Sequence, residues 1–268
     1  MQLLAFLATV TLLAVLSSAA VIPRPQHELR SLFNASLQDH IQSRRDNIQT
    51  NQLPAGAVLN QCTVPGTVAL TFDDGPYIYT PQLLDTLSAH HAVATFFLNG
   101  VNKGSIAAFP DLVRRTLAEG HQLGSHTWGH LSLPSLPYPS ILDQMISLED
   151  SLSALLGFYP TYMRFPYLQY DGVSLAAMAE LGYRVIGASV DTKDYENDDP
   201  GLSWRSFEKF KTELNAGGTI VLAHDSHQTT AEVLVDNMLA EIERRGLKMV
   251  TVGECLGEPA EFWYRQGR

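Results

Sequence analysis

The chain has 268 residues, of which 45% are hydrophobic and 17% charged, and its formal net charge at pH 7 is −10. This acidic balance makes nucleic acids and anionic membranes poor partners, because both would repel the chain. The length is enough for one large α/β domain with a full hydrophobic core, after allowance for an N-terminal leader.

The N-terminus begins with an apolar stretch, Leu3–Leu16, which is followed by the small residues Ser17–Ala20. This order is typical of a secretory signal peptide, although no Lys or Arg precedes the apolar stretch. We expect residues 1–20 to be cleaved near Ala20, and a retained membrane anchor is the alternative. No later segment approaches the length of a transmembrane helix. The expectation is therefore a secreted protein, extracellular or in the cell wall, that is free of the membrane after cleavage.

The next segment, residues 21–61, is more polar and predicts a pro-segment or an arm lying on the domain. Its Asn-x-Ser sequon, at Asn34, is a candidate glycosylation site in the secretory context. The two cysteines, Cys62 and Cys255, lie near the two ends of the candidate domain. In an oxidising compartment we expect them to form a disulfide that ties the start of the domain to its end; two buried thiols are the alternative.

From residue 67 onward, β-rich runs alternate with amphipathic helical stretches. The expected strands are Val68–Phe72, Ala94–Leu98, His121–Gly124, Tyr162–Phe165, Arg184–Ser189, Thr219–Ala223 and Leu247–Val252. The expected helices are Pro81–His91, Ile106–Glu119, Ser140–Leu156, Val173–Glu180, Trp204–Asn215 and Thr229–Arg245. This alternation predicts parallel strands joined by right-handed crossovers. About seven such units favour a (β/α) barrel over an open sheet, as one domain at 62–257 with a C-terminal tail at 258–268.

Polar residues lie at or next to the ends of six of the seven expected strands. They are Asp73–Asp74, Asn99, Ser125–His126, Arg164, Asp191 and His224. The carboxyl ends of the strands of a β/α barrel gather on one face, and active sites lie there. We therefore expect these residues to meet in space and form an active site.

The paired carboxylates follow the first strand, Val68–Phe72. An isolated Asp-Asp-Gly-Pro would be interpreted as a solvated turn, because Asp, Gly and Pro are turn residues. Neighbouring side chains of an extended chain point to opposite sides. Asp73 and Asp74 could therefore share one site and still face different groups, one a metal and the other a substrate.

His126 and His130 are four residues apart, a spacing that places both imidazoles on one face of a helical turn. No Glu follows His126, so the pattern is not the His-Glu-x-x-His of zinc proteases. With one Asp, the pair would make a three-ligand metal site with open positions for water and substrate. A metal there would acidify a water and polarise a carbonyl oxygen.

His224 ends a very apolar strand and is a candidate fourth ligand, proton donor or structural histidine. Asp191, at the end of another strand, is a candidate partner that would orient His224 and stabilise its charged form. The guanidinium of Arg164 suits pairing with a carboxylate, most simply that of Asp73.

Five short motifs carry a resemblance to a known family. They are Thr71–Pro76, Ser125–His130, Arg164–Tyr167, Asp191–Tyr195 and Leu222–His224. In this order they resemble the motifs of the NodB-type polysaccharide deacetylases, carbohydrate esterase family four. Within that family the chain is most similar to secreted fungal chitin deacetylases, in its signal peptide, its compact catalytic domain and its paired terminal cysteines. The family fold, a distorted (β/α) barrel, agrees with the strand–helix pattern.

The resemblance implies a base and a metal site at the first two motifs. Asp73 would be the general base, held by Arg164. Asp74, His126 and His130 would bind one divalent metal, usually zinc, with cobalt as the other possibility.

The resemblance also implies roles in the last three motifs. His224 would be the general acid, tuned by Asp191. The backbone N–H of Tyr167 would help to stabilise the oxyanion, and Leu222 would line the pocket for the acetyl methyl group. The fourth motif usually ends in Trp, whereas here it ends in Tyr195. A phenol fills less volume and adds a hydroxyl, so we expect a different wall of the acetate pocket.

The expected function is hydrolysis of N-acetyl groups from chitin or chitooligosaccharides, giving acetate and chitosan, by a monomeric enzyme. Deacetylation of peptidoglycan or acetylxylan is the alternative within the same chemistry. A non-haem iron oxygenase also uses two histidines and a carboxylate, but its His-x-Asp spacing is missing and iron would leave Asp73 and His224 without a task. A carbohydrate-binding protein without catalysis is disfavoured because every expected catalytic side chain is present.

Overall fold

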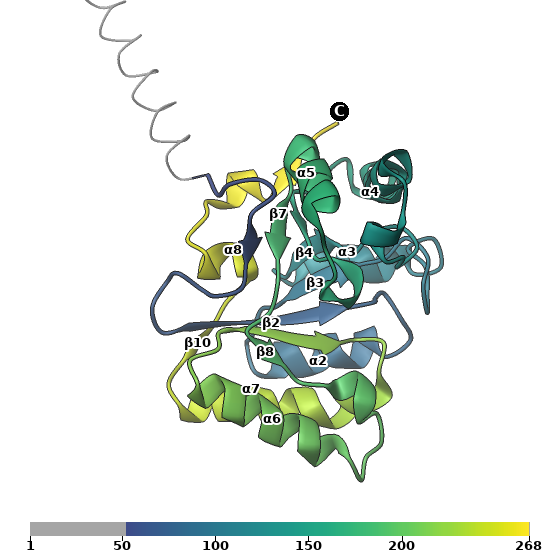
Figure 1. The fold of residues 1–268 in the computed structure, drawn as a ribbon. Coiled ribbons are helices and arrows are strands. Elements are labelled where there is room, and N and C mark those ends of the chain that lie inside the picture. The colour runs from purple at the N-terminus through teal and green to yellow at the C-terminus, as the bar shows by residue number, and fades with distance from the viewer. Residues whose placement is uncertain (1–51, 268) are drawn as a thin grey trace, which may run out of the picture. The chain divides into compact units, whose positions relative to one another are not determined.

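The computed structural model describes residues 52–267, so the expected signal peptide and Asn34 lie outside the described residues. Within that range, parallel strands form a curved sheet that helices cover on its outer side (Figure 1). No helix among residues 52–267 combines the length and the apolar character needed to cross a membrane.

The main sheet has nine strands, and all its pairs are parallel. In spatial order they are β1 (Val58–Leu59), β7 (Arg184–Ile186), β6 (Tyr162–Met163), β4 (Gln122–Ser125), β3 (Thr95–Leu98), β2 (Thr67–Asp73), β9 (Ile220–His224) and β8 (Val190–Asp191), and β10 (Lys248–Met249) also pairs with β2. The two strands at the ends of this order, β1 and β8, do not pair, so the barrel is open between them. The expected barrel is therefore confirmed in its distorted form.

Helices connect the strands in the expected alternation. They are α2 (Thr80–Ala89), α3 (Pro110–Ala118), α4 (Tyr138–Leu156), α5 (Gly172–Leu181), α6 (Ser203–Asn215), α7 (Val235–Arg244) and the short α8 (Val252–Cys255). In Figure 1, α6 and α7 lie below the strands and α5 lies above them. The expected helix over 229–245 is interrupted, because its first part, Thr230–Leu234, is a π-helical turn.

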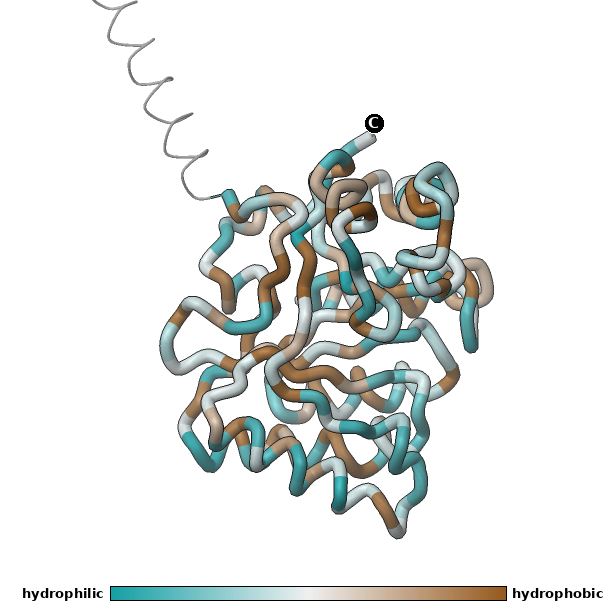
Figure 2. The backbone as a smooth tube through the Cα atoms, viewed as in Figure 1, coloured by the Kyte–Doolittle hydropathy of each residue, from teal (hydrophilic) through white to brown (hydrophobic). Residues whose placement is uncertain are grey.

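β2 is the strand around which the core forms. All seven of its residues are buried, because it pairs with β3 on one side and β9 on the other. Leu70 and Phe72 belong to a cluster that includes Leu83 of α2 and Met238 of α7. Figure 2 shows this hydrophobic centre as brown segments. The strand that ends in Asp73 is thus fixed by packing along its whole length.

Both ends of the described chain are tied to the domain. β1, in the segment expected as an arm, pairs with β7. In the segment after residue 257, expected as a tail, β11 (Tyr264–Arg265) pairs antiparallel with β5 (Tyr159–Pro160). The expected disulfide between Cys62 and Cys255 is present and links positions 193 residues apart.

Glu258, just beyond the expected domain boundary, makes a buried ion pair. Its Oε1 accepts hydrogen bonds from Arg184 Nη2 at 2.6 Å and from Leu53 N at 3.0 Å, and Tyr162 donates to Oε2. The Arg184 and Glu258 side chains are 1% and 0% exposed. Glu258→Ala would leave a buried guanidinium without its counter-charge, and we expect a loss of about 3–5 kcal/mol in the free energy of unfolding.

Urea unfolding of the parent protein and of Glu258→Ala measures this loss of free energy of unfolding. The matched control is Arg115→Ala, which breaks the surface pair with Asp85, and we expect it to cost no more than about 1 kcal/mol. Equal losses in the two variants would contradict the structural importance of Glu258.

Candidate active site

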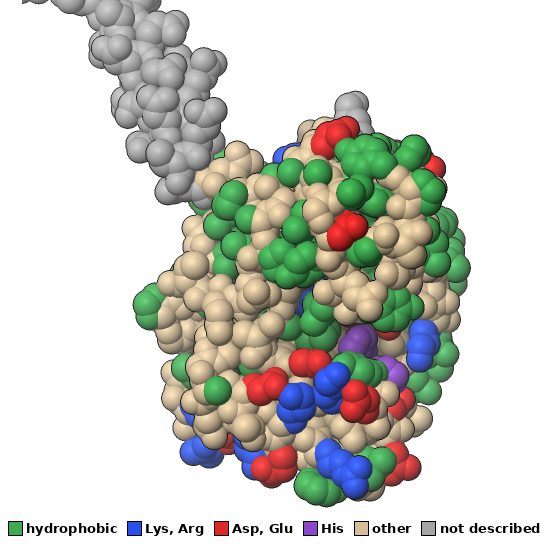
Figure 3. Space-filling model, in the orientation of Figure 1, with side chains coloured by type: hydrophobic (Ala, Val, Ile, Leu, Met, Phe, Trp, Pro, Cys, Tyr) green, Lys and Arg blue, Asp and Glu red, His purple; other side chains and the backbone are tan. Residues whose placement is uncertain are grey.

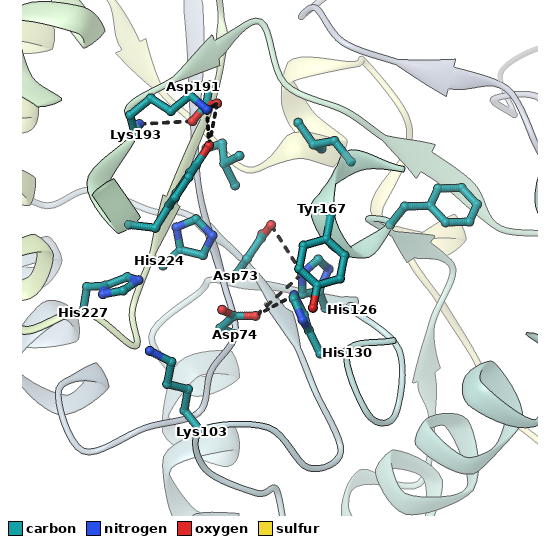
Figure 4. A pocket seen from close by; sticks show the side chains of 14 residues that line it. Asp73, Asp74, Lys103, His126, His130, Tyr167, Asp191, Lys193, His224 and His227 are labelled. Atoms are coloured by element: carbon teal, nitrogen blue, oxygen red, sulfur yellow. Dashed lines mark hydrogen bonds and ion pairs between the residues drawn. The ribbon is translucent and has the colours of Figure 1, made fainter. Parts of the chain in front are cut away.

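A cavity of about 550 Å³ lies at the carboxyl ends of the strands. The ends of β2, β8 and β9 line it, together with the loops that follow β4 and β6. Figure 3 shows histidine side chains in a hollow on this face of the molecule, and Figure 4 shows the side chains that surround the cavity. Most of the expected site residues line the cavity directly, and the exceptions are Asn99, Ser125 and Arg164.

Asp74, His126 and His130 form a group that can hold a metal ion, as expected. One ligand atom from each lies within 4.8 Å of the others. The Nε2 atoms of His126 and His130 are 3.7 Å and 3.2 Å from Asp74 Oδ1. Two imidazole nitrogens and one carboxylate oxygen are a donor set typical of catalytic zinc, with positions left for water and substrate.

The second nitrogen of His126 fixes its orientation. Nδ1 donates to the carbonyl oxygen of Arg164 at 2.8 Å, so Nε2 is the nitrogen turned to the cavity. This outer contact is the usual companion of a metal-binding histidine. Burial lowers the pKa of His126 to about 3, which keeps the ring neutral and able to bind a metal. The residues present therefore fit a divalent ion.

The helical turn expected at 126–130 is wrong. Thr127 and His130 have φ values of 72° and 53°, in the left-handed region that interrupts a right-handed helix. The loop is held instead by α4, because Trp128 N and Gly129 N donate to the backbone and side-chain oxygens of Gln144. The two rings still meet, with centroids 4.9 Å apart. The four-residue spacing therefore predicted correctly that His126 and His130 lie together, but it did not predict the backbone conformation that brings them together.

Asn102 supports Asp74 and was not predicted as a site residue. Its Nδ2 donates to Asp74 Oδ1 at 2.9 Å and to Asn99 Oδ1 at 3.2 Å. Asn99, a predicted strand-end residue, uses its amide to hold the carbonyls of His126 and Thr127. The only signal in the sequence for Asn102 was its place in the loop directly after a strand that ends in a polar residue.

Arg164 pairs with Asp73, as expected, from inside the barrel. Nη1 donates to Asp73 Oδ1 at 2.9 Å, and the guanidinium is fully buried. Nε and Nη2 donate to the carbonyls of Ile186, the last residue of β7, and of Gly187, which follows it. Arg164 thus satisfies two backbone acceptors where β7 ends. Burial raises the pKa of the Asp73 carboxyl above its ordinary value, and the charge of Arg164 opposes this rise.

The predicted partner of His224 is wrong. His224 Nδ1 bonds to Asp194 Oδ1 at 2.8 Å, and Asp194 Oδ2 accepts from the backbone N–H of His224 at 2.7 Å. Asp191 instead faces Lys193 and Tyr195, whose hydroxyl donates to it at 3.2 Å (Figure 4). After β8 the chain turns at Lys193, with φ 57°, and this turn brings Asp194 beneath His224.

The charge state of His224 follows from that contact. Burial lowers its pKa, but the adjacent Asp194 carboxylate outweighs burial and raises the pKa of His224 to about 9. An imidazolium at neutral pH can give a proton to a departing group.

The remaining predicted residues form the cavity wall. Tyr167 has φ 59°, is 62% exposed, and packs its ring edge on His130 at 4.7 Å. Leu222 is buried beneath the cavity. Tyr195, in place of the usual Trp, stands edge-on to His224 at 5.4 Å and is half exposed.

Comparisons with known proteins agree with this geometry. Residues 60–186 match the family described as polysaccharide deacetylase. A chitin deacetylase and a probable peptidoglycan-N-acetylglucosamine deacetylase, both of Arthroderma benhamiae, are 51% and 50% identical over 80% and 81% of this chain. The chain spans 58% and 50% of the length of these two relatives. The structure of the chitin deacetylase from Colletotrichum lindemuthianum is 44% identical, with a TM-score of 0.78 over 81% of this chain and 98% of that one. The chain therefore belongs to the polysaccharide deacetylase family.

Proposed function

We propose that this protein hydrolyses N-acetyl groups from the N-acetylglucosamine residues of chitin or chitooligosaccharides, releasing acetate. The observation that carries the proposal is that a metal triad, a buried carboxylate and an imidazolium line one cavity. Relatives named as chitin deacetylases, one of them matched over nearly all of its solved chain, support the choice of substrate.

Each group has a task in amide hydrolysis. Asp73, held by Arg164, takes a proton from the attacking water, whose oxygen forms the new bond to the acetyl carbon. His224, held by Asp194, gives a proton to the nitrogen as the C–N bond breaks, so acetate and a free amine are formed. A divalent ion at Asp74, His126 and His130 would polarise the acetyl carbonyl and make water more acidic.

The walls of the cavity complete the proposed site. The backbone N–H of Tyr167 stabilises the developing oxyanion, and Leu222 contacts the acetyl methyl group. Two imidazoles and a carboxylate favour zinc as the metal, with cobalt as the substitute of similar ligand preference. We further propose that the enzyme acts outside the cell as a monomer, and its disulfide is consistent with an oxidising compartment.

The substrate is tested by acetate release from chitin oligomers of several lengths, peptidoglycan and acetylxylan. We expect the highest kcat/KM on chitin oligomers. Peptidoglycan is the second candidate, because a relative with 50% identity is named as a probable deacetylase of that polymer. Acetate from peptidoglycan or acetylxylan alone would refute the chitin assignment. No acetate at all, with oxygen consumption or with sugar binding only, would favour an oxygenase or a binding protein.

The proposed acid role of His224 makes a prediction about pH. The protonated form is the working form and its pKa is raised, so activity is lost as the pH rises through about 9. Asp194→Asn removes the charge that stabilises the imidazolium, and the alkaline limb of kcat/KM should move down by about one to three pH units. Asp191→Asn, which changes a carboxylate that does not touch His224, is the control. An unmoved limb in Asp194→Asn, or an equal shift in both variants, would contradict this assignment.

A further inference from the structure

A second histidine–carboxylate pair places its histidine, His227, in the cavity wall, and the mechanism above leaves the pair without a task. His227 Nδ1 bonds to Asp198 Oδ2 at 2.8 Å, and Asp198 Oδ1 accepts from Thr229 N at 3.0 Å. The His227 side chain is 12% exposed and belongs to the cavity wall. Both oxygens of Asp198 are therefore engaged, and the imidazole is held in one orientation.

This pair repeats the arrangement of His224 and Asp194. His224 ends β9 and His227 lies just after it, and both carboxylates come from the segment after β8. The His224 and His227 rings are perpendicular, with centroids 5.6 Å apart. In Figure 4, His227 lies beside His224 on the side of the cavity away from His126 and His130.

The hydrogen bond to Asp198 decides what His227 offers to the cavity. A carboxylate only accepts, so Nδ1 carries the proton and Nε2 of a neutral ring is an acceptor. Among residues 52–267, no group forms a hydrogen bond to this Nε2. His227 thus presents an oriented ring nitrogen without a protein partner, which suits a hydrogen bond with a hydroxyl group of a ligand.

We propose that His227 is a substrate-positioning residue, whose Nε2 forms a hydrogen bond with a ring hydroxyl of the sugar that carries the scissile acetamido group. This inference rests on the proposed deacetylase function. His224 must reach the leaving nitrogen, which is bonded directly to the sugar ring. The ring therefore lies next to His224, and its neighbouring hydroxyls come within reach of His227. Asp198 acts through His227 by holding the imidazole.

The competing explanation is that His227 only fastens two loops together. Two substitutions separate the explanations. His227→Asn places an amide near the position of Nδ1, so it can keep the bond to Asp198 but does not reach the position of Nε2. His227→Gln extends to the position of Nε2 and offers an acceptor there, but it loses the bond to Asp198. The control is His90→Phe, which removes a histidine that bonds to Asp236 and Glu243 outside the cavity.

The experiment measures binding of a chitin tetramer by calorimetry in the Asp73→Asn background, where turnover is slowed enough for the tetramer to stay intact during the measurement. We expect His227→Asn to raise Kd about tenfold, the loss of one hydrogen bond, and His227→Gln to raise it less. With Asp73 restored, His227→Asn should raise KM by a similar factor and leave kcat nearly unchanged. Thermal melting and metal content should match those of the parent protein.

If His227→Gln binds the chitin tetramer more weakly than His227→Asn does, the role of His227 is to hold the two loops together, and the proposal is overturned. An unchanged Kd in both variants would overturn it as well. If one variant does not fold, the other decides. For His227→Asn alone, a tenfold higher Kd supports the proposal and an unchanged Kd contradicts it. For His227→Gln alone, a near-normal Kd despite a lowered melting temperature supports the proposal, and a Kd raised tenfold or more contradicts it. Failure of the proposed function is seen separately, as an unsubstituted enzyme that releases no acetate from chitin oligomers.

Discussion

Asp73→Asn is expected to lower kcat for acetate release about 10²- to 10⁴-fold, because it removes the group that we propose as the base that takes the proton from water. Asparagine has the same shape, and its oxygen can still accept the hydrogen bond from Arg164. Its neutral amide cannot act as a base. The metal triad does not include Asp73, so the bound metal should remain.

Turnover rate and metal stoichiometry are measured on the same preparation of the Asp73→Asn variant. Asp85→Asn, at a surface carboxylate that pairs with Arg115, is the matched control and should retain full activity. The parent enzyme should lose activity as the pH falls, because protonated Asp73 is not a base. Burial raises the pKa of Asp73, so this acid limb should lie above the ordinary carboxyl value of 3.8. Near-normal turnover by Asp73→Asn would remove it from the role of base.

The sequence predicted the fold well where hydrophobic pattern decides structure. β2 is buried along its whole length, and its run of apolar residues predicted a strand that ends at the aspartates. β1 and β8 were not predicted, because each has only two residues and pairs with a strand distant in the sequence. Such short strands exist through their neighbours, and local propensity carries little information about them.

The sequence predicted the site residues better than their contacts. Asp191 was chosen as the partner of His224 because it ends a strand, whereas Asp194 reaches His224 only after the left-handed turn at Lys193. A single residue with positive φ changes the direction of the chain, and the hydrophobic periodicity of a sequence does not predict where such a residue occurs. Asp194 does stand in the fourth motif, so the motif contained the residue while strand-end reasoning selected another.

The one signal for His227 in the sequence was its position three residues after His224. Its partner Asp198 lies 29 residues away, in a loop of polar residues and Pro200 that gives no pattern. The sheet register brings the two together: Asp191 of β8 lies opposite Leu222 of β9, so the loops after these strands leave the sheet side by side. Contacts between loops depend on this register, which the sequence leaves open between several alternatives.

His126→Ala and His130→Ala are each expected to weaken metal binding more than about 100-fold and to abolish acetate release. A two-residue remnant of the triad cannot hold the ion against a chelator, and a site without its ion has lost the group that polarises the acetyl carbonyl. Asn102→Ala keeps all three ligands but frees the carboxylate of Asp74, so its affinity should fall by about 10- to 100-fold.

Metal affinity is measured by competition with a chromophoric chelator, and His90→Ala serves as the surface control because that histidine lies outside the cavity. The expected order of affinity is parent and His90→Ala first, then Asn102→Ala, then the two ligand variants. This order is expected because each histidine variant loses a metal ligand, whereas Asn102→Ala loses only the hydrogen bond that orients the ligand Asp74. Stoichiometric metal in a fully active His126→Ala/His130→Ala double variant would refute the site.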